Sequence, residues 1–443
     1  MTEPAASSSY LARQWWLVRT ALWTVLALMI AAAVTLHPAI VERFLSSDGQ
    51  LAPGSRRLLF VMEAGAGIAA ALTFLAGRRL RVHSATGERL VLGAAFALTS
   101  VAISVVVCEV GLRAAAGFRP LRADRHFFFE HDELLGWRHR PGAIALFKDA
   151  IVRINAAGLR DDELPGEQPK DWRLLFLGDS QTFGDGVTAE DTFVQRLERQ
   201  HRSVHAINAG VIGYGTDQEV LYFERDGLKY APNVTIVGVN AYDLRDNIST
   251  QVRSGYVKPR FELLNGALHL TNVPIPPGSI VDRAQRDLRT HSYLYVMFDG
   301  ALGSRSARAD DEDGEGRRLG AAQVFPRSNQ LATALAVTRA LLVRLADRVH
   351  ATGGRMAVVF LPYEMDFDQS PDYNERTGRL MATLEDAARD ADFAILDLRP
   401  TLGSGRGLYR DTMHFSPDGH QRVTVALDAF LRQHGLIPAT DAR

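Results

Sequence analysis

Two short blocks of this sequence combine residue types that can perform nucleophilic catalysis. One is Gly-Asp-Ser-Gln-Thr-Phe-Gly from Gly178 to Gly184, and the other is Asp-Thr-Met-His from Asp411 to His414. A serine hydroxyl is a weak nucleophile at neutral pH, so it needs a nearby base and a carboxylate that orients that base. A carboxylate and an imidazole three residues apart in a turn can lie side by side. We therefore predict that Ser180 is the nucleophile, His414 its general base and Asp411 the partner of the imidazole.

The elements around these blocks are typical of an open α/β sheet. The apolar run Leu174–Leu177 reads as a buried parallel strand, and the glycine-bounded turn after it can expose the serine at the edge where such sheets bind ligands. Strands and helices then alternate, as in a doubly wound fold. We expect strands at Arg173–Gly178, Val204–Asn208, Val234–Val239, Met356–Leu361 and Phe393–Leu396, and a C-terminal helix at Pro417–His434.

With these blocks in this order, the region from about Asp132 to Leu436 resembles the SGNH (GDSL-type) hydrolase superfamily. The resemblance implies a flavodoxin-like three-layer α/β/α fold, a Ser-His-Asp triad and an oxyanion hole. That hole would use the serine's own backbone N–H, a glycine and an asparagine. The stretch from Asn208 to Gly213 resembles the second block of the family, which places Gly213 at the oxyanion glycine. A glycine suits this role because no side chain hinders the approach of its N–H to the oxyanion.

The third block departs from the family pattern, in which Asn-Asp often follows the third strand. Here the chain reads Gly-Val-Asn-Ala-Tyr-Asp from Gly238 to Asp243. One alignment makes Asn240 the amide donor of the oxyanion hole, and we favour it; the other places Tyr242 there, whose hydroxyl can also donate. Loss of one such donor typically costs about 100- to 1000-fold in turnover. The choice between the two residues therefore affects the rate of the reaction more than the kind of reaction that is predicted.

Three apolar stretches precede the hydrolase-like region, at about Thr20–Val41, Leu58–Gly77 and Leu90–Leu112. Each approaches the ~20 residues that a helix needs to cross a bilayer. Tryptophans near the first stretch and arginines around the second are typical of membrane interfaces. We therefore predict three transmembrane helices rather than a cleaved signal peptide. Glu63 and Glu109 lie near the ends of their stretches, and we interpret both as structural or interfacial.

The arginines that flank the stretches, six on one side and seven on the other, do not decide the orientation of these helices by number alone, so we give weight to their position. The short loop between the second and third stretches, Arg78 to Arg89, is the densest in arginine and closest to the stretches. Placing it in the cytoplasm satisfies the positive-inside tendency. With three crossings, the catalytic region then lies outside the cytoplasm. We expect a multi-pass protein of the bacterial inner (cytoplasmic) membrane.

The domain organisation predicted from these patterns has three parts. Residues 1–115 form the membrane domain, 116–171 a juxtamembrane β-rich lead-in, and 172–443 the hydrolase-like domain. Lead-ins with a Gly-Trp pair occur before Gly-Asp-Ser in membrane-tethered bacterial relatives, and the plain interpretation is that Trp137 packs this one onto the core. An insertion at about 250–330 interrupts the hydrolase-like domain; it holds a hairpin-like segment with an Asn-Gly turn and an acidic run that reads as a loop.

Composition excludes several classes of function. The 443 residues carry a formal net charge of −1, and no basic stripe with interleaved aromatics is present, which argues against binding nucleic acid. The hydrophobic content of 47% is an average over an apolar N-terminal third and a globular part of ordinary composition. The single cysteine, Cys108, lies in the third apolar stretch and leaves no disulfide framework or zinc ligand set. No metal or organic cofactor is implied.

The function implied by the residues and the resemblance is a membrane-anchored serine ester hydrolase. Analogy with membrane-fixed relatives favours O-acetyl groups of cell-envelope or exported polysaccharide over lipid esters as the substrate. One alternative is a polysaccharide O-acyltransferase with the same triad, which would need a partner membrane protein to donate the acyl group. Another is a catalytically inactive, membrane-anchored scaffold, for which the altered third block is the main support. For the hydrolase we expect activity to rise through about pH 6 to 8, as His414 loses its proton.

Overall fold

We describe the protein from a computed structural model. The described residues are 102–103, 105–106, 108–113, 122–123, 125–162, 172–253, 255–295, 321–367, 370–403, 405 and 407–439. The chain divides into two units. One comprises Met1–Leu121 with Ala284–Leu302, and the other comprises Arg122–Arg283 with Gly303–Arg443.

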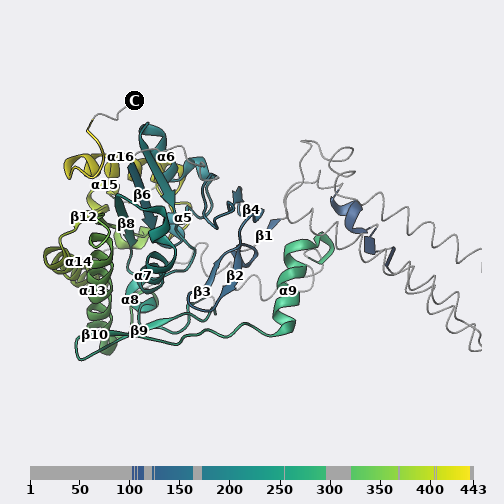
Figure 1. The fold of residues 1–443 in the computed structure, drawn as a ribbon, viewed down its shortest axis with the longest axis horizontal. Coiled ribbons are helices and arrows are strands. Elements are labelled where there is room, and N and C mark those ends of the chain that lie inside the picture. Colours follow the sequence, from purple (N-terminus) through teal and green to yellow (C-terminus); the bar gives the residue numbers. More distant parts are fainter. Residues whose placement is uncertain are drawn as a thin grey trace, which may run out of the picture. The chain divides into compact units, whose positions relative to one another are not determined.

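A five-stranded parallel sheet organises the second unit (Figure 1). Its strands are β6 (Trp172–Leu177), β7 (Val204–Asn208), β8 (Val234–Val239), β11 (Arg355–Phe360) and β12 (Ala394–Asp397). They lie in the order β12-β11-β8-β6-β7. Numbered along the chain from β6, this order is the flavodoxin-like 2-1-3-4-5. The flavodoxin-like α/β fold expected for the hydrolase-like region is thereby confirmed, as are the expected strands, each to within one residue at either end.

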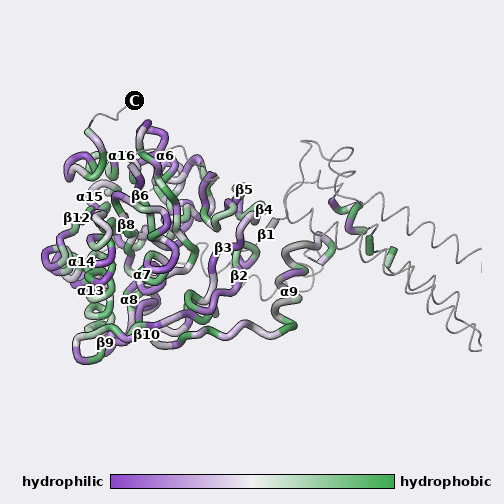
Figure 2. Tube along the Cα trace, viewed as in Figure 1, coloured by the Kyte–Doolittle hydropathy of each residue, from purple (hydrophilic) through white to green (hydrophobic). Residues whose placement is uncertain are grey.

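Helices cover both faces of this sheet, as an all-parallel sheet requires. Alternate residues of each strand enter separate cores: Leu174 and Phe176 of β6 face one core, and Leu175 and Leu177 face the other. Figure 2 shows hydrophobic and hydrophilic residues mixed along α13, which packs with one side on its core. The first core includes α6 (Phe193–Gln200) and α16 (Pro417–Gln433), and the second includes α7 (Thr216–Arg225), α13 (Ser328–His350) and α14 (Pro371–Ala391).

The lead-in before β6 is a set of short strands within the same unit. Two of them, β2 and β3, form an antiparallel pair, while β4 pairs with β5 antiparallel and with β1 parallel. The elements are β1 (Arg122–Ala123), η1 (Arg125–Phe128), β2 (Phe129–Asp132), β3 (Gly136–His139), β4 (Ile144–Phe147) and β5 (Ala150–Arg153). Trp137 is fully buried, and its indole N–H donates to the carbonyl of Ile212 at 3.2 Å. The expectation that Trp137 packs the lead-in onto the core is confirmed.

Short elements lie at the carboxyl edge of the sheet and in the connections. The insertion contains the expected hairpin, β9 with β10, and its turn residues Asn265 and Gly266 both have positive φ, as a type I′ turn needs. The acidic run from Asp310 to Gly316 lies outside the described residues. The short elements are α5 (Ser180–Phe183), η2 (Ala189–Asp191), η3 (Gly227–Tyr230), α8 (Asp243–Asp246), β9 (Arg260–Leu264), β10 (Ala267–Thr271), α12 (Ala321–Val324), η4 (Glu364–Phe367) and α15 (Arg399–Leu402). The longer helix α9 (Ile280–His291) belongs mostly to the first unit.

The predicted membrane helices fall mainly on residues that the structure does not describe. The stretches Thr20–Val41 and Leu58–Gly77, with Glu63, lie wholly outside the described residues, as does the larger part of Leu90–Leu112. No helix among the described residues is long and apolar enough to cross a membrane.

Glu109 belongs to the described part of the first unit. Its carboxylate accepts hydrogen bonds from Arg113 at 2.9 Å, from the Ser292 hydroxyl at 3.0 Å and from the N–H groups of Tyr293 and Leu294 at 2.9 Å. These contacts give Glu109 the structural role expected of it.

Candidate active site

Ser180 is the first residue of α5, and Gly178 and Asp179 connect it to the end of β6. The chain reverses at Gly178, where φ is +154° and where a Cβ would clash with the Thr182 hydroxyl, so glycine is required. Asp179 caps the helix by accepting the N–H of Gln181 at 2.9 Å. This cap and the glycine turn fix Ser180 at the carboxyl edge of the sheet, as the motif predicts.

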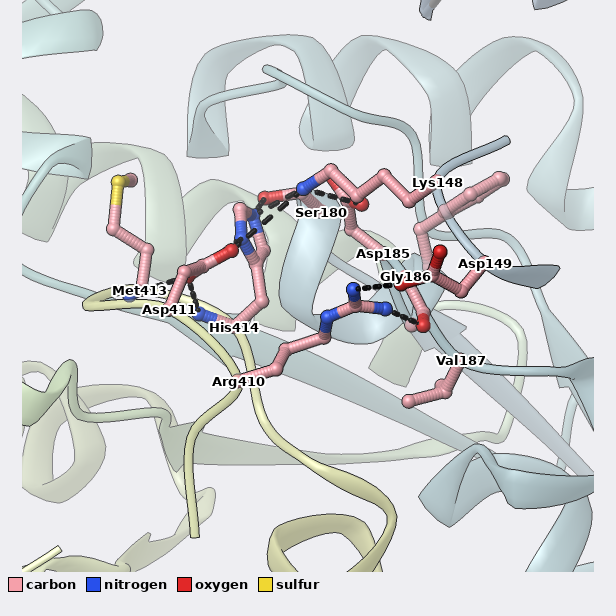
Figure 3. Close-up of polar contacts among 12 residues, drawn as sticks. Lys148, Asp149, Ser180, Asp185, Gly186, Val187, Arg410, Asp411, Met413 and His414 are labelled. Carbon is pink, nitrogen blue, oxygen red and sulfur yellow. Dashed lines mark hydrogen bonds and ion pairs between the residues drawn. The ribbon is translucent and has the colours of Figure 1, made fainter. Parts of the chain in front are cut away.

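The structure brings the three predicted triad residues into one hydrogen-bonded array (Figure 3). His414 Nε2 lies 3.0 Å from Ser180 Oγ, and His414 Nδ1 lies 2.8 Å from Asp411 Oδ2. Asp411 Oδ1 also accepts the backbone N–H of Met413 at 2.8 Å and that of His414 at 2.7 Å. This turn locks the carboxylate against the ring. The imidazole can therefore take a proton from the serine while its other nitrogen stays oriented.

The charge state of Asp411 suits that role. Burial by itself raises the pKa of this carboxyl, but the hydrogen bond and charge of His414, together with the Lys148 ammonium, lower the pKa below its ordinary value. Asp411 is consequently ionised across the neutral range, where it can stabilise an imidazolium.

The groups expected to form an oxyanion hole, at Ser180, Gly213 and Asn240, line one pocket. The N–H groups of Ser180 and Gly213 have no hydrogen-bond partner in the described part of the chain. Gly213 has a φ of +82°, which favours glycine. Asn240 donates one amide hydrogen to Asp179 Oδ2 at 2.9 Å, and its Oδ1 accepts the N–H of Tyr242 at 2.9 Å. An amide carries two donors, so one hydrogen of Asn240 remains for a ligand.

These groups line a single pocket of about 160 Å³. Tyr242 lines it as well, and its hydroxyl lies 3.5 Å from Arg253 Nη1. Burial raises the pKa of the Tyr242 hydroxyl, so it stays protonated. Both candidates for the third oxyanion donor thus border the pocket. The full lining is Arg125, His126, Lys148, Asp179, Ser180, Asp185, Ile212, Gly213, Tyr214, Asn240, Tyr242, Asp243, Asp246, Val252, Arg253, Tyr363, Asp411, Met413 and His414.

Two charged residues that sequence reasoning missed stand beside the triad (Figure 3). Lys148 Nζ lies 2.9 Å from Asp185 Oδ1 and 3.7 Å from Asp411 Oδ2, and Asp185 Oδ2 lies 3.5 Å from His414 Nε2. Asp185 directly follows the Gly-Asp-Ser block, so its position near Ser180 was open to inference. Lys148 comes from the turn between β4 and β5, and no pattern in the sequence marked it.

The lead-in also clamps the loops that carry the site. Arg160 is 1% exposed, and its guanidinium donates to the carbonyl of Phe183 at 2.7 Å and to those of Gly184 and Val187. Burial lowers the pKa of Arg160 to about 10, against the opposing charges of Asp185 and Glu190, and the side chain remains a cation. The Tyr214 hydroxyl donates to the carbonyl of Trp137 at 2.5 Å, next to Gly213.

A metal site needs several ligating side chains close together, and the structure can show such a group only within the residue ranges that it describes. No three His, Cys, Asp or Glu side chains there are arranged to hold a metal ion.

Comparison with known proteins complements this geometry. No curated protein matches the chain. Among solved structures, TesA is 12% identical over 59% of this chain and 98% of its own, with a TM-score of 0.34. The esterase EstA from Pseudoalteromonas sp. is 11% identical over 60% and 100%, with a TM-score of 0.35. A mutant of Axe2, an acetyl-xylooligosaccharide esterase from Geobacillus Stearmophilus, is 12% identical over 60% and 96%, also with a TM-score of 0.35.

The family comparison covers most of the region that contains the sheet. The profile of the GDSL-like Lipase/Acylhydrolase family matches residues 176–422, which include Ser180, Asp411 and His414. The chain belongs to this family and is an ester-hydrolysing enzyme.

Proposed function

We propose that the protein is a serine esterase in which Ser180 forms an acyl-enzyme with the acyl group of an O-acyl ester. The observation that carries the proposal is the continuous array from Ser180 Oγ through His414 to Asp411, with spacings of 3.0 and 2.8 Å. An inactive scaffold has no need of such an array.

The proposed acylation step divides its work between the triad, which moves a proton, and the oxyanion donors, which bind the developing negative charge. Ser180 Oγ attacks the ester carbonyl as His414 Nε2 takes its proton, and Asp411 stabilises the imidazolium. The developing oxyanion accepts hydrogen bonds from the Ser180 and Gly213 N–H groups and from Asn240. We favour Asn240 over Tyr242 because Asp179, the neighbour of Ser180, holds the Asn240 amide in place. His414 then protonates the departing alcohol.

We further propose that the substrate carries a short acyl group on a polar alcohol, as in the O-acetyl esters of a polysaccharide. The pocket volume of about 160 Å³ is small, and most of the residues that line it are charged or polar. The aliphatic lining is confined to Ile212, Val252 and Met413. A long fatty acyl chain needs an extended apolar channel, so this lining supports carbohydrate esters over lipids.

The site of action that we propose is the outer face of a bacterial inner membrane. The support is the sequence of the first 115 residues, with its apolar stretches and flanking arginines. Membrane fractions washed with alkaline carbonate test this proposal. Retention of the full chain in the pellet is expected, with the hydrolase region digested by protease added to spheroplasts. Release by carbonate, or protection from the protease, would contradict it.

Hydrolysis of p-nitrophenyl acetate by the purified full chain tests the chemistry. We expect turnover by the wild type, none above background for Ser180→Ala, and wild-type turnover for Ser249→Ala, which removes a hydroxyl outside the pocket. Equal turnover by the wild type and Ser180→Ala would refute the proposal.

A further inference from the structure

Asp185 is a carboxylate that the acylation step described above does not use. It follows Gly184 in the loop after α5, is 2% exposed and lines the pocket. Its Oδ2 lies 3.5 Å from His414 Nε2, the nitrogen that exchanges protons with Ser180. Asp411, by contrast, contacts the opposite nitrogen of the ring. The imidazole therefore has a carboxylate on each side (Figure 3).

Asp185 presents an open hydrogen-bond acceptor at this place. Lys148 Nζ pairs with Oδ1 at 2.9 Å, and among the described residues none donates a hydrogen bond to Oδ2. Burial raises the pKa of the Asp185 carboxyl, but His414 and Lys148 outweigh burial and lower the pKa below its ordinary value. An ionised carboxylate accepts hydrogen bonds and donates none.

The position of Asp185 Oδ2 bears on deacylation, the step in which an acceptor molecule attacks the acyl-enzyme. The molecule that attacks the acyl-enzyme must place its oxygen within hydrogen-bond reach of His414 Nε2. Because Oδ2 is only 3.5 Å from Nε2, one such oxygen can lie within hydrogen-bond reach of both atoms. Water has two hydrogens and can donate one to Nε2 and the other to Oδ2. The hydroxyl of an alcohol has one hydrogen, so it turns a lone pair or its carbon toward the carboxylate.

We propose that Asp185 selects water over an alcohol as the acyl acceptor, so that the enzyme is a hydrolase rather than an acyltransferase. This inference rests on the proposed acyl-enzyme at Ser180. The water oxygen bonds to the acyl carbon while one of its protons passes to His414 Nε2 and the other is held by Asp185 Oδ2. The bond from Ser180 Oγ to the acyl carbon then breaks, His414 returns its proton to Oγ, and the carboxylic acid leaves.

Partitioning between water and methanol measures this selection directly. The full chain is incubated with p-nitrophenyl acetate in buffer containing methanol, and the ratio of methyl acetate to acetate is determined. We expect Asp185→Asn to raise this ratio about tenfold, since hydrogen bonds to charged groups are the strong ones and an amide can also donate to an alcohol oxygen. Asp185→Glu retains the carboxylate, and its ratio should stay close to that of the wild type. Asp149→Asn, a matched change on the neighbouring hairpin turn and outside the pocket, should leave the ratio unchanged.

After subtraction of the acetate and methyl acetate formed without enzyme, the ratio is internal to each sample, so a partial loss of folded enzyme does not alter it. Should Asp185→Asn fail to fold, Asp185→Ser removes the same carboxylate and carries the same expectation. Equal ratios for the wild type and the variant that lacks the carboxylate would overturn the role of Asp185 while leaving the esterase intact. Absence of p-nitrophenol release by the wild type would overturn the proposed function and this inference with it.

Discussion

The loops at the carboxyl edge of the sheet and the lead-in from Arg122 to Arg160 contribute differently to one site. The loops supply the groups proposed to react, Ser180 and His414 among them. The lead-in supplies Lys148, which pairs with a carboxylate beside the triad, and Arg160, which holds the loop after α5. A motif can therefore indicate the chemistry of a site, while residues outside the motif contribute to the charge and the rigidity of that site.

The largest effect should come from the loop side. Asp411→Asn keeps the shape of the turn but no longer stabilises an imidazolium, and we expect kcat to fall about 10⁴-fold. Rates of p-nitrophenyl acetate hydrolysis measure this loss. Asp372→Asn, an exposed carboxylate on α14, is the control and should be unaffected. A loss below about tenfold would remove Asp411 from the proposed triad.

On the lead-in side, Arg160→Met should act mainly on stability. It leaves the carbonyls of Phe183, Gly184 and Val187 buried without this donor. We expect a loss of about 3 kcal/mol in the free energy of unfolding, because unsatisfied buried acceptors are costly. Urea unfolding measures it, with the exposed Arg348→Met as control. An unchanged midpoint would mean that the lead-in does not clamp the loop.

Lys148→Met tests the charge that the lead-in contributes. Without the ammonium, Asp185 and Asp411, which flank the imidazole, both lose the cation that lies 2.9 Å and 3.7 Å from their carboxylates. We expect kcat/KM at neutral pH to fall about tenfold and the acid limb of the pH–rate profile to move to higher pH. Lys229→Met, an exposed lysine on η3, provides the comparison. A profile identical to that of the wild type would reduce Lys148 to a structural role.

The smallest effect is a dependence of stability on pH at Asp411. Its folded-state pKa lies below the unfolded value of about 3.9, so its contribution is present above that value and is lost as the pH falls below it. The difference in stability between the wild type and Asp411→Asn should therefore shrink by on the order of 1 kcal/mol between pH 6 and pH 3. Thermal unfolding at both pH values measures it. A difference that grows in acid would contradict the assigned direction.

Much of the fold was predictable because its signals are local. The central strands β6, β8 and β11 hold largely apolar runs that are buried on both faces, and β7 and β8 have the predicted bounds. Asp411 and His414 are three residues apart, so their contact follows from one turn. Their approach to Ser180 follows from the shared edge of a parallel sheet.

The remaining features of the site depend on contacts between distant segments. Lys148 reaches Asp185 because the hairpin of β4 and β5 packs beside α5, and nothing near Lys148 in the sequence encodes that packing. From the sequence alone Arg160 looks like an ordinary cation in a loop, because the carbonyls that it contacts belong to a separate segment. The preference for Asn240 over Tyr242 in the proposed mechanism likewise draws on the position of Asp179, which the alignment of motifs did not supply.

Covalent labelling of the nucleophile tests the central claim most directly. The full chain is incubated with diethyl p-nitrophenyl phosphate, which transfers a diethylphosphoryl group to an activated serine, and its peptides are mapped by mass spectrometry. We predict one label per chain, on Ser180, in proportion to the loss of esterase activity, and no label on Ser180 in His414→Ala. A label on another residue that tracks the loss of activity would contradict the account, as would inactivation that leaves Ser180 unmodified.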